Sequence, residues 1–67
     1  MSEIDDLKAQ IKKLSARATN AKMNLHDLSE ELPLNWKDIM NVAQATHDAY
    51  QALEEARTQL KALEAAA

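Results

Sequence analysis

The sequence predicts an all-α fold, an antiparallel hairpin of two helices over about residues 3–31 and 36–65. Three observations support this prediction. The 67-residue chain has no glycine and only two aromatic side chains, so it is poor in the residues that build strands and tight turns. Apolar residues recur at alternating spacings of three and four in both halves, as in packed helices. The one proline, Pro33, separates the two halves.

The first helix is predicted from a continuous seam of apolar or small residues. Its members are Ile4, Leu7, Ile11, Leu14, Ala18, Ala21, Leu25, Leu28 and Leu32. Ser2 is a suitable N-cap, with Asp5 as an acidic residue in the first turn. Pro33 disfavours helical angles at Leu32, so the helix should end there or at Glu31.

The second helix is predicted from a matching seam with one polar member, Thr46. The seam comprises Ile39, Val42, Thr46, Ala49, Leu53, Ala56, Leu60, Leu63 and Ala67. We expect Asn35 to cap this helix, with Asp38 near its N-terminus. A connection of about four residues holds the two helices side by side and antiparallel.

The two seams also predict one register. A fold-back near Pro33 and Leu34 places opposite one another residues whose numbers sum to about 67. The expected pairs are Leu28 with Ile39, Leu25 with Val42, Ala21 with Thr46, Ala18 with Ala49, Leu14 with Leu53, Ile11 with Ala56, Leu7 with Leu60 and Ile4 with Leu63. The layers at Ala18 and Ala21 are thin, which lets the helices approach closely or leaves room for another subunit.

A lone hairpin of this size buries little apolar surface, so the sequence predicts a homodimer that forms a four-helix bundle. Further stripes widen the apolar face. They comprise Met40, Ala43, His47 and Tyr50 on the second helix and Ala9, Ala16 and Met23 on the first. The alternative is that these residues are helix-favouring surface positions of a monomer.

Composition excludes several classes of function. The chain 1–67 is one small helical domain without cysteine, so it has no thiolate chemistry, and its size argues against an enzyme. The acidic N-terminal segment MSEIDDLKAQ is neither a secretory signal nor a transmembrane helix. We expect a soluble cytoplasmic protein with no membrane partner.

The stretch AKMNLHDLSEELPLNW, residues 21–36, followed by Ala43, Tyr50 and Leu53, resembles the Rop-like family of small bacterial proteins. The resemblance covers nearly the whole chain, and its specific part is the pattern K-M-x-L-H-D-L-x-E-x-L-P-x-N-W. It implies a hairpin that dimerises. It also implies a noncatalytic accessory role in nitrogen fixation, with an unidentified nitrogen-fixation protein as partner.

His26 and Glu30 lie one helical turn apart and form a candidate chelate for a divalent transition metal. The resemblance places a histidine at this point of the motif. Two ligands do not close a tetrahedral site, so any affinity should be modest. The competing interpretation is a polar surface histidine that packs near Trp36 or contacts a partner.

Trp36 and Pro33 stand at the predicted hairpin tip, where a tryptophan outside both seams suggests a contact for a protein partner. The alternative is that Trp36 plugs the end of the core over Leu32 and Ile39. A mutation separates the two, because only a plug should stabilise the fold.

Two further groups point only weakly to function. His47 and Asp48 suggest a catalytic pair, but neighbouring helical residues do not face each other and no nucleophile is spaced to join them. The protein after which the family is named binds RNA, which draws attention to five cations, Lys8, Lys12, Lys13, Arg17 and Lys22. Acids interleave with them and the net charge is −3, so nucleic-acid binding is a lesser alternative.

Overall fold

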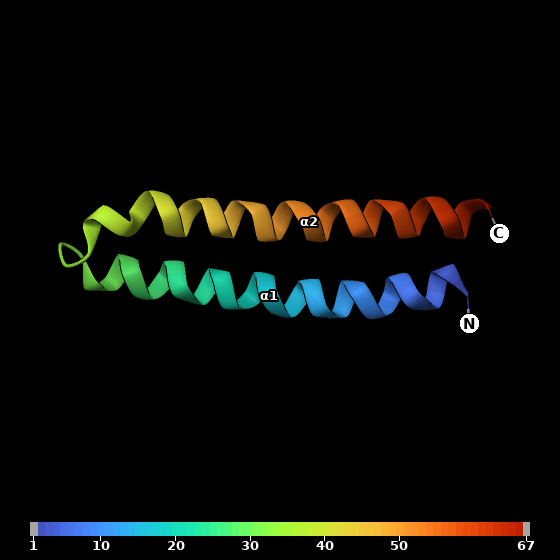
Figure 1. Cartoon of the computed structure of the whole chain (residues 1–67), viewed down its shortest axis with the longest axis horizontal. Coiled ribbons are helices and arrows are strands. Elements are labelled where there is room, and N and C mark those ends of the chain that lie inside the picture. Colours follow the sequence, from blue (N-terminus) through green and yellow to red (C-terminus); the bar gives the residue numbers. More distant parts are fainter. Residues whose placement is uncertain (1, 67) are drawn as a thin grey trace.

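The computed structural model describes residues 2–66 and shows two long helices that run side by side in opposite directions (Figure 1). Helix α1 spans Glu3–Glu31, a short 3₁₀ helix η1 spans Trp36–Asp38, and α2 spans Ile39–Ala66. Residues 2–66 contain no strand. The predicted all-α antiparallel hairpin is therefore confirmed.

The start of α1 follows the expected capping chemistry. Ser2 has extended backbone angles, and its Oγ accepts a hydrogen bond of 3.2 Å from the backbone N–H of Asp5. Glu3, Asp5 and Asp6 fill the first turn, where carboxylates interact favourably with the positive end of the helix dipole.

The connection between the helices differs from the prediction at Asn35. This residue has left-handed angles (φ 59°, ψ 23°), and its side chain makes no capping hydrogen bond. Side-chain capping requires an extended backbone at the cap, whereas asparagine is one of the few residues that tolerate the left-handed region. Its carbonyl instead accepts a bond of 2.9 Å from the Asp38 N–H. The second helical segment therefore opens with η1, and the regular α-helix begins at Ile39 instead of residue 36.

The core lies along the predicted seams. Within residues 2–66 the buried residues are all seam members: Leu7, Ala18, Leu28, Leu53 and Ala56. Most other seam residues are half-buried. At the tip the seam opens, since Leu32 and Ile39 are 40% and 37% exposed.

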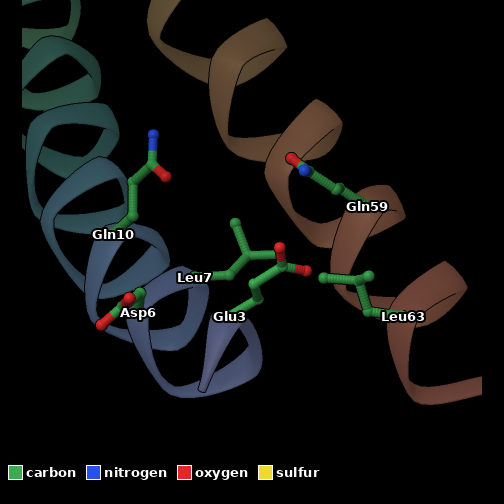
Figure 2. A pocket seen from close by; sticks show the side chains of 6 residues that line it. All are labelled: Glu3, Asp6, Leu7, Gln10, Gln59 and Leu63. Carbon is green, nitrogen blue, oxygen red and sulfur yellow. The ribbon is translucent and has the colours of Figure 1, made fainter. Parts of the chain in front are cut away.

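A hydrogen bond across the interface confirms the predicted register. The Thr46 hydroxyl lies 2.8 Å from the Val42 carbonyl oxygen of its own helix and 3.2 Å from the Ala21 carbonyl oxygen of α1, and it can donate to either. Ala21 and Thr46 are therefore opposite one another, as the sum of their numbers requires. At the far end, Figure 2 shows Leu7 of α1 and Leu63 of α2 lining the same hollow. They are diagonal neighbours and not one of the predicted pairs, which are Leu7 with Leu60 and Ile4 with Leu63.

The hairpin is a thin rod. Its principal dimensions are 51 × 15 × 13 Å, and its radius of gyration is 15.3 Å. A globular chain of this length would have a radius of gyration of about 11 Å. Because only two helices lie side by side, nearly every residue stays close to solvent.

Candidate functional site

The hairpin tip carries a concentration of exposed apolar side chains. Seven large apolar residues are exposed in the part of the chain that the structure describes, and five of them fall between residues 32 and 40. These are Leu32, Leu34, Trp36, Ile39 and Met40, which we call the tip patch. An exposed apolar cluster of this kind is characteristic of interaction sites.

Trp36 is 59% exposed and Leu34 is 68% exposed. Trp36 leaves both Leu32 and Ile39 partly open to solvent, so it does not seal the end of the core. The Lys37 ammonium lies 5.9 Å from the centre of the indole ring, at the outer limit of a cation–π contact. The ring is thus presented at the tip and is available to a partner.

Sequence reasoning identified Trp36 and Pro33 at the tip but missed Leu34. The Leu34 N–H donates a hydrogen bond of 3.0 Å to the Glu31 carbonyl, which closes a turn around Pro33. Leu34 belongs to neither seam, and it lies between a proline and an asparagine. An apolar residue in such a turn cannot reach the core between the helices. This position in the sequence was the signal that could have identified Leu34 as an exposed tip residue.

His26 and Glu30 come together as predicted. The distance from His26 Nε2 to Glu30 Oε1 is 3.3 Å, and both side chains are largely exposed. With metal–ligand bonds of about 2.1 Å this separation gives an angle of about 105° at the metal, close to the tetrahedral value. The separation is therefore compatible with two ligands of one metal ion, and it is equally that of a hydrogen-bonded histidine–carboxylate pair.

A third ligand does not converge on this pair. Asp27 Oδ1 lies 3.6 Å from the other ring nitrogen of His26, Nδ1, so it approaches the opposite edge of the imidazole. Within residues 2–66, no cluster of three or more His, Cys, Asp or Glu side chains is arranged to hold a metal ion. The hairpin alone offers two ligands, and others would have to come from solvent or a second molecule.

His47 and Asp48 are in contact, which contradicts the expectation that adjacent helical residues stay apart. His47 Nδ1 lies 3.2 Å from Asp48 Oδ1, and the Gln44 amide donates to the same oxygen at 2.8 Å. The hydrogen bond with His47, followed by that from Gln44, lowers the pKa of Asp48 below its usual value. These partners are an imidazole and an amide, so the contact itself provides no hydroxyl or thiol nucleophile.

Neither α1 nor α2 is both long and apolar enough to cross a membrane, within the residues described.

Comparison with known proteins identifies the family. Residues 2–65 match the profile of the Rop-like family. A UPF0437 protein of Azorhizobium caulinodans is 63% identical over 67 residues, covering all of this chain and 97% of the relative. A Frankia alni relative, named a UPF0437 protein in a nifX-nifW intergenic region, is 46% identical over 41 residues, 61% of this chain and 50% of the relative.

A solved structure shows the same fold. It is an NMR structure from a structural genomics consortium, with a TM-score of 0.87 and 52% sequence identity, and the match covers 96% of this chain and 92% of that one. The sequence match and the shared hairpin agree over nearly the whole chain. The chain belongs to the Rop-like family.

Proposed function

We propose that this protein is a noncatalytic accessory protein of nitrogen fixation, a dimeric helical adaptor that acts in the cytoplasm and presents its hairpin tip to a protein partner. Its family membership and the gene location named for the Frankia alni relative support the link to nitrogen fixation. The exposed residues at the very end of the rod, Leu32, Leu34 and Trp36 of the tip patch, support the role as an adaptor.

Surface area supports the dimer. The chain exposes 5386 Å², whereas a folded monomer of 7.5 kDa should expose about 4,250 Å². The excess is about 1,100 Å² per chain, which is more than one partner buries in an interface of standard size. A second hairpin would cover this excess and complete a four-helix bundle.

The observation that carries the adaptor role is the exposed indole of Trp36, with Pro33 and Leu34 before it in the turn. Tryptophan is enriched among the residues that dominate binding energy at protein interfaces. His26, one helical turn before Glu30 near the end of α1, adds a polar group to the same end of the rod. We propose Trp36, Pro33 and His26 as contacts for the partner.

We expect Trp36→Ala to abolish capture of the partner from extracts of nitrogen-fixing cells while leaving the thermal midpoint nearly unchanged. Exposed side chains contribute within about 0.5 kcal/mol to stability. Gln51→Ala is the control, since Gln51 is exposed on α2 and lies far from the turn and from His26. Unchanged capture by Trp36→Ala, or a sharp fall in its thermal midpoint, would contradict this role. Capture that disappears after RNase treatment would favour RNA binding instead.

A second candidate function is binding of a divalent metal, supported by the separation of 3.3 Å between His26 and Glu30. We expect Zn²⁺ titration followed by NMR to shift the signals of both residues, and His26→Ala to remove the response. His47→Ala is the control, because His47 lies beside Asp48 on the other helix. The absence of any shift at stoichiometric Zn²⁺ would reject a metal site.

A further inference from the structure

The two broad faces of the rod carry opposite charge. Helical periodicity places five cations and three acids on one side of the seams, which we call the basic face. The cations are Lys8, Lys12, Lys22, Arg57 and Lys61, and the acids are Asp5, Glu54 and Glu64. The formal charge of this face is therefore +2.

The opposite side, the acidic face, carries seven acids and two cations. The acids of α1 on this side are Glu3, Asp6, Asp27 and Glu31. Asp38, Asp48 and Glu55 follow in η1 and α2, and the cations are Lys13 and Arg17. The formal charge of this face is −5. Acidic and basic residues that are mixed along the sequence therefore lie mostly on opposite faces of the fold.

Figure 2 supports the assignment of the acidic face. Glu3, Asp6 and Gln10 of α1 line one hollow between the helices together with Gln59 of α2. A second hollow farther along the rod is lined by Ala21, Asn24, Asn41, Val42, Ala45 and Thr46. The side chains that flank the seams on this side and line these two hollows are thus short or polar.

The basic face holds the larger exposed apolar groups. Met40 is 78% exposed and Tyr50 is 41% exposed, and both project on this side of α2. Several of the seam residues nearest to this face are large and remain only half-buried: Ile4, Ile11, Leu25 and Leu60. Ala18 and Leu53, at equivalent seam positions in the middle of the rod, are buried. Together they form an apolar strip along the rod that the hairpin cannot cover by itself.

We propose that the second copy of the chain packs on the basic face and leaves the acidic face in solvent. This inference rests on the dimer of the proposed function and names its interface. The uncovered apolar strip and the excess surface of about 1,100 Å² per chain fit a second hairpin of the same length.

Electrostatics favours this face over the other. A symmetric dimer brings identical surfaces together, so pairing through the acidic face would oppose two surfaces of charge −5. Pairing through the basic face opposes surfaces of only +2, and long lysine and arginine side chains can extend to the rim while their stems cover apolar area. The acidic faces then point outward and keep the assembly soluble.

The double variant Met40→Lys and Tyr50→Lys tests the interface. We expect it to weaken the dimer by about tenfold or more, measured by light scattering over a range of concentrations. The matched control is Asn41→Lys with Gln51→Lys, which adds the same charge at neighbouring positions that turn away from the basic face. The control should dimerise like the wild type.

A measurement on the wild-type protein removes any dependence on how the variants fold. In a mixture of isotope-labelled and unlabelled chains, we expect intermolecular NOEs to Met40 and Tyr50. Intermolecular NOEs to Ala45 and Asn24 instead would contradict the basic face as the interface but not the dimer itself. Dissociation of the control variant alone would have the same meaning. A monomeric wild-type protein would overturn both the inference and the proposed dimer.

Discussion

Truncating Leu53 to alanine is expected to lower the free energy of unfolding by about 2 to 3 kcal/mol, because it removes a large buried side chain from the apolar core. Leu53 is 3% exposed, the most deeply buried of the leucines. The expected loss lies at the lower end of the range for such truncations, since a layer of two helices can relax into the space. Chemical denaturation followed by circular dichroism, at equal chain concentration, measures it.

Leu34→Ala is the control for this prediction. It removes the same atoms from a side chain that is mostly in solvent at the turn. Its free energy of unfolding should match that of the wild type within about 0.5 kcal/mol. Equal losses in the two variants would show that Leu53 is not part of the core.

Enlarging Ala18 to leucine is expected to destabilise the hairpin by about 1 to 3 kcal/mol. Ala18 is 1% exposed and opposes Ala49 in the predicted register, so the added methyl groups have no space. The helices must separate at the middle of the rod or the new side chain must adopt a strained rotamer. The same denaturation experiment reports the loss.

Ala16→Leu is the matched control, because Ala16 is exposed on the same helix only two positions away. Leucine has a helix propensity close to that of alanine, so this variant should keep the wild-type stability. Stabilisation by Ala18→Leu would instead mean that the thin layer contains unfilled space.

The helices and their register were predictable because both depend on the periodic spacing of apolar residues along the sequence. A spacing of three and four places each seam on one side of a helix, and a short connection leaves one way to fold back. The Thr46 hydroxyl beside the Ala21 carbonyl confirms this register at a particular pair. The cap at Ser2 was predictable for a similar reason, since it depends only on neighbours in sequence.

The turn and the charged faces were harder to predict. Asn35 has two local uses, as a cap or as a left-handed residue, and the path of the chain between the packed helices selects the second.

Counting charges along the sequence suggested a mixed surface. Their segregation becomes evident only once the seams define which side of each helix a residue occupies. His26 and Glu30 were found from spacing, but the separate approach of Asp27 to the other ring nitrogen depends on rotamers.

The hydroxyl of Thr46 has an acceptor within its own helix, the Val42 carbonyl, at the shorter of its two distances. It would therefore remain satisfied if the helices slid past one another, so the polar seam residue does not prevent such a slip. The slip must therefore be prevented by the small side chains in the middle of the rod. A slip of the helices by seven residues would place Leu25 where Ala18 now meets Ala49. The larger side chain would push the helices apart. The small alanines at the middle of the rod therefore fix the register of the two helices.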